Sequence, residues 1–160
     1  MYCTNCGSLL STKFIRNEGD IPYCQSCDKL YFPKMNLAMI TILVNSKEQI
    51  CLAQQNKLSK HKGLLAGFIK VGETLEDCVK REVKEEVGID VDKCEYLNSY
   101  FYEKNEVLMY GFISHTEMND FVIDKDEIES AEWYDKSDCL HRIREGSIAH
   151  RLVKEYLERN

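Results

Sequence analysis

The sequence contains no long hydrophobic run and no excess of positive charge. None of its stretches approaches the ~18 apolar residues that a membrane-spanning helix needs. Its N-terminus, MYCTNCGSLL, has neither the basic start nor the apolar run of a signal peptide. We therefore expect a cytoplasmic protein with no membrane partner.

The charge balance argues against another class of partner. The chain has 27 acidic and 21 basic side chains, which give a formal net charge of −6. A long nucleic acid or an anionic membrane is bound through a basic surface, and this composition does not supply one. A substrate with several negative charges would therefore need metal ions to accompany it.

Internal repeats and low-complexity linkers are also missing. The 160 residues, 44% of them hydrophobic, are enough for one well-buried core and a small accessory module. Short polar segments dominate as far as Tyr31, and a long apolar run begins soon after it. We expect a small module over residues 1–31 and the main domain over residues 32–160.

Four of the eight cysteines form two close pairs near the N-terminus. The pairs Cys3-x2-Cys6 and Cys24-x2-Cys27 have 17 residues between them, which is within the spacing of a zinc ribbon. Two tight turns with four thiolates suit a structural Zn²⁺ site, and the metal would supply folding energy that so short a segment lacks. A redox-active dithiol is the alternative. The remaining cysteines are predicted to be buried thiols and are Cys51, Cys78, Cys94 and Cys139.

A zinc ribbon can also be a nucleic-acid-binding module, and this is a rival interpretation of the N-terminal segment. Its charged residues are mixed in sign and form no basic stripe. They are Lys13, Arg16 and Lys29 against Glu18, Asp20 and Asp28. The balance favours a structural or dimerising role.

Five apolar stretches have the length and the branched residues of β-strands. They cover residues 37–44, 50–54, 95–102, 107–114 and 128–134. The glycines between Gly63 and Gly72 indicate a loop with a short strand, and helical spacing of apolar residues predicts a helix over residues 148–157. Together with one further helix, this pattern favours an α/β sandwich.

That further helix is predicted over residues 75–87. Thr74 is a suitable N-cap with Asp77 three residues later, and Gly88 follows the last periodic residue. At ~100° per residue, one broad arc of the helix is apolar. The members of this arc are Leu75, Cys78, Val79, Val83 and Val87.

Glutamates interrupt the apolar arc of this helix. Glu82 and Glu86 fall in the middle of the arc, and Glu85 lies at its edge. A charged carboxylate that faces inward is costly unless it is paired, and Arg81 can pair with at most one of them. Mg²⁺ or Mn²⁺ would compensate the rest, because hard cations bind carboxylate oxygens. The alternative is a solvated acidic face that pairs with lysines.

The stretch from Gly67 to Ile89, GFIKVGETLEDCVKREVKEEVGI, resembles the Nudix box G-x5-E-x7-R-E-U-x-E-E-x-G-U, where U is a bulky aliphatic residue. All nine specified positions match. The resemblance implies a Nudix-type α/β/α sandwich with a mixed sheet. It also implies that Glu82, Glu85 and Glu86 are the main metal ligands, with the Gly67 carbonyl as a further one. Glu73 and Arg81 would form a supporting ion pair.

The same resemblance implies hydrolysis of a nucleoside diphosphate linked to another group, by attack of water on phosphorus. Members of the family differ in which carboxylate accepts the proton. Glu85 and Glu127 are the two candidates here, and Glu127 would also reach the metal ions. Glu127 precedes Trp133 by six residues, as a glutamate does in relatives with a zinc ribbon. It could instead be a solvated acid of an acidic loop.

A four-cysteine ribbon, then Tyr31-Phe32-Pro33, a strand and a Nudix box resemble the C-terminal part of the NADH pyrophosphatase family. The resemblance extends to Gly146-Ser-Ile-Ala-His-Arg-Leu152. It implies that Phe32 and Phe68 stack on a base, and that the turn at Ser147 to Ala149 lies by the substrate. The alternative is that both phenylalanines belong to the core.

This sequence departs from that family in two ways. The family's longer members have a separate N-terminal domain, for which these 160 residues have no counterpart. The family's S-Q-P-W-P-F-P segment, which marks NADH preference, is here Ser99-Tyr-Phe-Tyr-Glu-Lys-Asn105. Ser99 is kept as a substrate-binding candidate, but the prolines and the glutamine are gone.

The sequence therefore predicts a zinc-ribbon Nudix hydrolase that acts on a small nucleotide, with NAD(H) or ADP-ribose as the leading candidates. Diadenosine polyphosphates, damaged nucleotides and an NAD-type cap on RNA remain open. By resemblance we also expect a homodimer. The non-enzymatic alternative is a zinc-ribbon regulator that senses a nucleotide with a Nudix fold, against which the intact Glu82, Glu85 and Glu86 argue.

Overall fold

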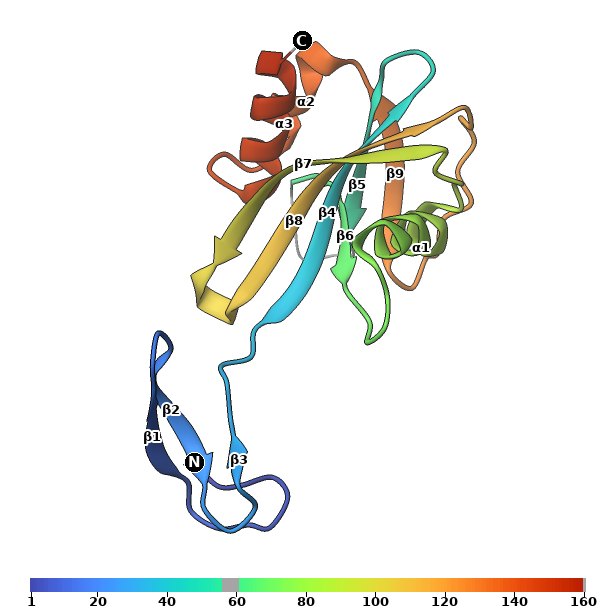
Figure 1. Cartoon of the computed structure of the whole chain (residues 1–160). Helices are drawn as coiled ribbons and strands as arrows, with labels where there is room; N and C mark the ends of the chain where they lie inside the picture. Colours follow the sequence, from blue (N-terminus) through green and yellow to red (C-terminus); the bar gives the residue numbers. More distant parts are fainter. Residues whose placement is uncertain (56–60, 160) are drawn as a thin grey trace. The chain divides into compact units, whose positions relative to one another are not determined.

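The computed structural model describes residues 1–55 and 61–159 (Figure 1). The chain divides into two compact units, Met1–Met35 and Asn36–Asn160. The boundary falls four residues later than the one drawn from the sequence, so the peptide that follows Tyr31 is counted with the first unit. No helix in the described part of the chain is long and apolar enough to cross a membrane.

The first unit is a small antiparallel sheet with almost no core. Strands β1 (Ser11–Ile15), β2 (Gly19–Cys24) and β3 (Lys29–Leu30) pair in the order β1-β2-β3. The buried hydrophobic side chains within residues 1–35 are Cys3, Ile21 and Cys24. Two of these three are members of the cysteine pairs. So little apolar burial does little to offset the loss of chain entropy, which is the situation in which small domains gain folding energy from a bound metal.

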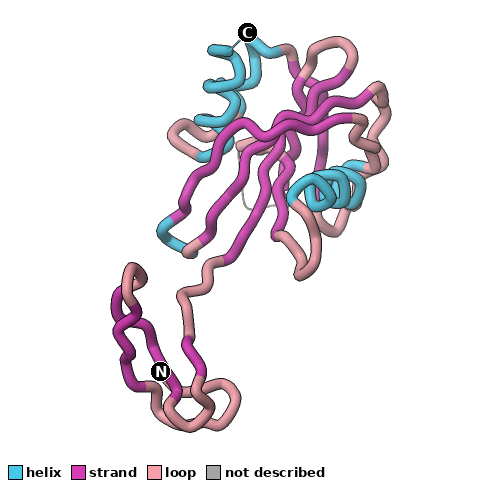
Figure 2. Tube along the Cα trace, in the orientation of Figure 1, coloured by secondary structure: helices cyan, strands magenta, loops and turns pink. Residues whose placement is uncertain are grey.

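The second unit is built on a mixed sheet, whose strands are magenta in Figure 2. The strand order is β7-β8-β4-β5-β9, and β6 pairs with β4. Strands β4 and β8 are parallel, and the other pairs are antiparallel. The strands are β4 (Asn36–Asn45), β5 (Ile50–Gln55), β6 (Leu65–Phe68), β7 (Lys93–Tyr102), β8 (Val107–Thr116) and β9 (Ile128–Tyr134). All five predicted strands are present within two residues of their expected ends, and β6 is the short strand expected near the glycines.

Helices lie on both faces of this sheet. Helix α1 (Leu75–Val87) packs with one buried cluster, which includes Met39 and Leu43 of β4. Helix α3 (Ile148–Arg159) packs with the other, which includes Ile40 and Ile42. Alternate residues of β4 thus pack into the clusters on opposite faces of the sheet, because successive side chains of a strand point in opposite directions. The expected α/β/α sandwich with a mixed sheet is confirmed. The short helices α2 (Lys136–Arg142) and η1 (Glu103–Asn105), a 3-10 turn, were not predicted.

The ends of α1 are fixed by the residues that the sequence singles out. The Thr74 hydroxyl accepts a hydrogen bond from the Asp77 backbone N–H at 3.1 Å. Gly88 adopts the left-handed conformation with φ 73°, and its N–H donates to the Lys84 carbonyl at 3.0 Å. Helix α1 therefore begins and ends where the sequence predicts, which fixes the angular positions of its glutamates.

Candidate active site and metal centre

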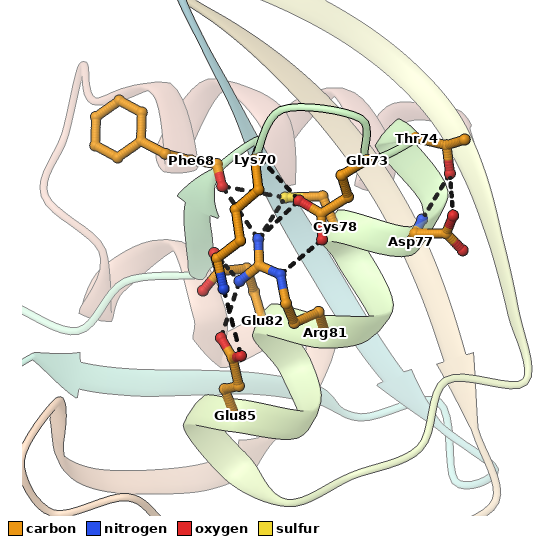
Figure 3. Close-up of polar contacts among 9 residues, drawn as sticks. All are labelled: Phe68, Lys70, Glu73, Thr74, Asp77, Cys78, Arg81, Glu82 and Glu85. Atoms are coloured by element: carbon orange, nitrogen blue, oxygen red, sulfur yellow. Dashed lines mark hydrogen bonds and ion pairs between the residues drawn. The ribbon is translucent and has the colours of Figure 1, made fainter.

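Arg81 is the centre of an ion-pair network on α1 (Figure 3). Its Nε and Nη2 atoms donate to the two oxygens of Glu73 at 2.6 and 2.9 Å. This two-point contact with the guanidinium, together with the backbone N–H of Lys70, lowers the pKa of Glu73 to about 2. Nη2 also donates to the Phe68 carbonyl at 3.1 Å. The ion pair implied by the family resemblance is present, and it ties the loop before α1 to the helix.

The same guanidinium also contacts two of the expected metal ligands. Its Nη1 atom lies 2.6 Å from Glu82 Oε1 and 2.9 Å from Glu85 Oε2. Lys70 Nζ lies 3.6 Å from the other oxygen of Glu85. Glu85 is exposed, whereas Glu82 is half-buried. The sequence correctly placed the charge of Arg81 here but underestimated how many carboxylates it would contact.

Glu86 is the unusual member of the group, because it is only 4% exposed. Its Oε2 atom has no hydrogen-bond partner among the described residues. Burial, with smaller contributions from the charges of Glu82, Glu127 and Glu85, raises the pKa of Glu86 to about 8. A buried carboxylate oxygen without a partner needs either a proton or a cation.

Gly67 leaves space for Glu82 against the sheet. It pairs with Met39 of β4, and a Cβ atom built at Gly67 would lie 2.0 Å from the Cδ atom of Glu82. No real contact is that short, so any side chain at this position must displace the Glu82 carboxylate. The glycine of the motif is therefore required by close packing on the helix.

Tertiary structure brings Glu127 toward the end of α1. It lies exposed in the turn just before β9. The loop that precedes this turn is attached to the helix, because the Asp124 N–H donates to the Glu86 carbonyl at 3.2 Å and the Val122 N–H to the Val87 carbonyl at 2.9 Å. The charge of Glu127 is close enough to raise the pKa of Glu86.

These side chains fit a hard divalent cation in the chemistry of their donors. The site offers carboxylate oxygens, and one of them, Glu86 Oε2, is buried without a partner. The carboxylates do not already converge on one point. Among described residues, the cysteine group alone has three or more ligand atoms that all lie within 4.8 Å of one another.

That group contains the four predicted cysteines, Cys3, Cys6, Cys24 and Cys27. Their Sγ atoms approach in pairs, at 3.9 Å between Cys3 and Cys27 and 3.6 Å between Cys6 and Cys24. The geometry is that of a four-thiolate metal site. Of the other cysteines, Cys51, Cys78 and Cys139 are buried and Cys94 is half-buried.

Two residues that the sequence analysis did not select support the thiolates. The Tyr31 hydroxyl lies 2.9 Å from Cys3 Sγ, and the Asn5 side-chain amide donates to Cys27 Sγ at 3.3 Å. The contact with Tyr31 lowers the pKa of Cys3 to about 6. Hydrogen bonds of this kind orient ligands and stabilise their charged form. No sequence spacing identifies such a partner, because Tyr31 meets Cys3 only through the sheet.

The predicted substrate residues are spread over both units. Phe32 belongs to the first unit and is 50% exposed, and Phe68 on β6 is 61% exposed. The alternative that these rings are core residues is therefore wrong. Figure 3 shows the Phe68 ring pointing away from the carboxylates.

Ser99 and Ala149 are not brought together within this chain. Tyr100 packs with the cluster on the α3 side, and its hydroxyl donates to Glu155 of α3 at 3.1 Å. Because neighbours in a strand alternate, Ser99 faces the α1 side of the sheet. Ala149 packs on the α3 side.

Ala149 also lines a cavity of about 230 Å³ on the α3 side of the sheet. Its apolar part comes from β4, β5, β6 and the segment before α3, and includes Ile40, Ala53, Leu64, Ala66 and Ile143. Its polar lining consists of Gln55, His61, Lys62, Arg144 and Ser147. Ala66 is the neighbour of Gly67, so this cavity adjoins strand β6, against which Glu82 of α1 packs. Of these residues, the sequence analysis had placed only the turn at Ser147 to Ala149 by the substrate.

Fold and site together define an α/β/α domain that presents a carboxylate cluster on one capped helix and a cavity of about 230 Å³ on the other side of the sheet. The family model for the NUDIX domain matches residues 34–156. The chain therefore belongs to the Nudix hydrolase family, as its motif predicts.

Comparison with known proteins gives related sequences and folds. The chain is 35% identical over 159 residues to the NAD-capped RNA hydrolase NudC of Pseudomonas putida (strain GB-1), and 32% identical over 158 residues to that of Pseudomonas fluorescens (strain Pf0-1). Each alignment covers 99% of this chain and 56% of the relative. The chain thus spans about half the length of the curated relatives it matches.

Two solved structures illustrate the shared fold. The crystal structure of a NUDIX hydrolase from Nitrosomonas europaea matches with a TM-score of 0.73 at 17% identity, over 99% of this chain and 91% of that one. The NUDIX domain of Shewanella oneidensis NrtR, determined with ADP ribose, matches with a TM-score of 0.68 at 18% identity, over 86% and 93%. At these identities the likeness concerns the fold alone.

The close approach of Gly67 to Glu82 gives a first testable prediction. In Gly67→Ala, the new Cβ atom pushes the Glu82 carboxylate aside by about 1 Å, and a misplacement of that size costs on the order of 100-fold in kcat. Titration calorimetry with Mn²⁺ should show weaker binding in the same variant. Gly63→Ala is the control for metal binding, because its Cβ atom would meet nothing within 4 Å. Unchanged Mn²⁺ affinity in Gly67→Ala would refute the role given to Glu82.

Proposed function

We propose that this protein hydrolyses the pyrophosphate linkage of a nucleoside diphosphate derivative, with Mg²⁺ or Mn²⁺ held by Glu82, Glu85 and Glu86. The buried, unpartnered Oε2 atom of Glu86 carries the proposal. A regulator that only binds a nucleotide would not need an inward carboxylate that destabilises its own fold. The Gly67 carbonyl and Glu127 are further candidate ligands.

Each of these residues has a different role in the proposed hydrolysis. Bound divalent cations supply neutralisation of phosphate charge and a lowered pKa of water. Glu73 and Arg81 hold the loop of Phe68 against α1, so that the ligands keep their geometry. Glu85 or Glu127 accepts the proton of the water that attacks phosphorus, and the bond from that phosphorus to the bridging oxygen breaks. Two phosphate-terminated products leave.

The leading substrates are NAD(H) and ADP-ribose. Support comes from the relatives named NAD-capped RNA hydrolase, at 32% and 35% identity. It also comes from the cavity next to Gly67, which has an apolar floor for a base and contains Ala149. Phe32 and Phe68 are exposed rings that can stack on a base, and Ser99 completes the candidate set. An NAD-type RNA cap is a further substrate, although the net charge of −6 argues against tight contact with a long RNA.

The proposal includes three further properties. The four cysteines hold one structural Zn²⁺, the protein is cytoplasmic, and it works as a homodimer. A site shared by two copies would explain why Ser99 and Ala149 face opposite sides of one sheet. Light scattering that reports a monomer at assay concentrations would contradict the dimer.

A substrate panel tests the proposed activity. The protein is incubated with NADH, NAD⁺, ADP-ribose, diadenosine polyphosphates and NAD-capped RNA, with Mg²⁺ or Mn²⁺, and the products are identified by mass. We expect cleavage between the two phosphates of NAD(H) or ADP-ribose, and no reaction in the presence of a chelator. Tight binding of these compounds without turnover would instead identify a nucleotide sensor.

A further inference from the structure

One arginine of the second unit makes no ion pair with any residue that the structure describes. Within residues 36–55 and 61–159, Arg81, Arg142 and Arg159 form ion pairs with carboxylates, and Arg151 stacks on the ring of Tyr100 at 4.7 Å. Arg144 is exposed and makes no ion pair or ring contact with any described residue. Arg144 lines the cavity that contains Ala149. A guanidinium that pairs with no described carboxylate is available for an anionic ligand.

The cavity as a whole has a positive character. Lys62 also lines it, with its ammonium 3.2 Å from Glu132 and 5.0 Å from the ring centre of Tyr134. This cation is held in place and is partly compensated. No described aspartate or glutamate lines the cavity. The neighbour of Arg144 in the sequence, Glu145, lines a different one. Two cations above an apolar floor suit a ligand with a flat apolar part and a negative group.

The pyrophosphate of the proposed substrate does not explain this charge. That group belongs with the carboxylates and their cations on the α1 side of β6, where Glu82 packs against Gly67. The cavity lies on the other side, lined by Ala66, which packs with the α3-side cluster. If the base of a nucleoside packed on the apolar lining, its ribose could face the polar lining, which includes Lys62 and Arg144. A second phosphate on that ribose would then meet these two cations.

We propose that Arg144 binds a phosphate monoester on the ribose of the nucleoside held in this cavity. Nucleotides with a 2′- or 3′-phosphate are then preferred to their unphosphorylated counterparts. The inference rests on the proposed function for its substrate class, because it assumes that the cavity holds the nucleoside. Arg144 acts as a specificity residue and takes no part in the attack on phosphorus.

Binding measured without divalent cations tests the inference separately from catalysis. Titration calorimetry compares adenosine 2′,5′-bisphosphate and adenosine 3′,5′-bisphosphate with AMP on the full chain. We expect at least one bisphosphate to bind more tightly than AMP, and the stronger one identifies the position of the phosphate. In Arg144→Gln this bisphosphate should lose about 10-fold in affinity, because a charge-assisted hydrogen bond to phosphate is lost, while AMP changes less than about 2-fold.

Arg151→Gln is the matched control, since it removes an exposed arginine that does not line the cavity. It should leave the preference for the bisphosphate unchanged. Equal affinity of AMP and both bisphosphates for the wild-type protein would overturn the inference. So would an equal loss for AMP and the bisphosphate in Arg144→Gln.

A hydrolysis assay on NADP⁺ and NAD⁺ keeps the two proposals apart. If both compounds are cleaved and Arg144→Gln lowers kcat/KM only for NADP⁺, both proposals hold for the 2′ position. Cleavage of neither compound, with the bisphosphate preference intact, refutes the hydrolase and supports the binding site. A third outcome is that both compounds are cleaved, Arg144→Gln has no effect, and the protein shows no preference for a bisphosphate. That outcome refutes the inference about Arg144 and leaves the proposed hydrolase function standing.

Discussion

Glu86→Gln abolishes Mg²⁺- or Mn²⁺-dependent hydrolysis and, at the same time, stabilises the metal-free protein at pH 8 and above. The first effect follows from the loss of a charged metal ligand, and we expect kcat to fall by at least ~100-fold. Initial rates on the preferred dinucleotide, measured over a range of Mn²⁺ concentrations, check it. Full activity in the variant would refute the assignment of Glu86 as a metal ligand.

The second effect follows from the burial of this carboxylate. The pKa of Glu86 is about 8 in the metal-free fold, against an ordinary value of 4.5. Because the pKa is raised in the folded state, the contribution of Glu86 to the free energy of unfolding is fully present below pH 4.5. This contribution is lost as the pH rises through 8, since the buried carboxyl must then become charged. Above pH 8 the glutamine variant, which carries no charge, should be more stable by about 1 kcal/mol or more. Its unfolding temperature would then rise by roughly 2–4 °C.

The unfolding temperatures of the wild type and Glu86→Gln, measured with and without Mn²⁺, test both the burial cost of Glu86 and its role in metal binding. Mn²⁺ should raise the unfolding temperature of the wild type and leave Glu86→Gln nearly unchanged. Glu158→Gln is the control, because it neutralises an exposed glutamate of α3 whose partner, Lys154, lies 3.9 Å away. A glutamine variant that is less stable than the wild type at pH 8.5 would contradict the burial argument.

Removal of zinc unfolds Met1–Met35 and leaves the second unit folded. The small unit buries only Cys3, Ile21 and Cys24 among its hydrophobic side chains. Structural zinc contributes on the order of 10 kcal/mol to such a domain, which exceeds anything its core can supply. Asn36–Asn160 has two large buried clusters and does not depend on this metal.

Metal analysis of the purified protein should find about one zinc per chain. The Cys24→Ser variant should lose this zinc, and proteases should then cleave it within residues 1–35. Cys94→Ser is its control, since that thiol lies outside the group. Tyr31→Phe should keep the fold but release zinc to a chelator faster, because the hydrogen bond to Cys3 is lost. A zinc-free preparation in which residues 1–35 are protected from proteolysis would refute the structural role.

Local patterns predicted most of the elements, because each depends on near neighbours in the sequence. The limits of α1 were right at both ends, since Thr74 and Gly88 act on the backbone next to them. The strands were right because their apolar residues are buried in the sheet. Helix α2 was missed, as its seven residues bury only Cys139 and so carry no periodic signal. The parallel pairing of β4 with β8 could not be predicted either, because it joins strands 71 residues apart, as in Asn36 and Val107.

For the site, the sequence by itself determined which chemical groups are available. The tertiary structure decided how deeply each group is buried, what it pairs with and how its pKa is shifted. The motif and the helical period selected Glu82, Glu85 and Glu86 as candidate metal ligands, and the spacing of the cysteines predicted the four-cysteine cluster. Burial of Glu86, the approach of Glu127, the contact of Tyr31 with Cys3 and the lack of a described ion-pair partner for Arg144 all depend on distant segments. A sequence pattern specifies which side chains share one helix or one turn, whereas desolvation and pairing depend on everything packed around them.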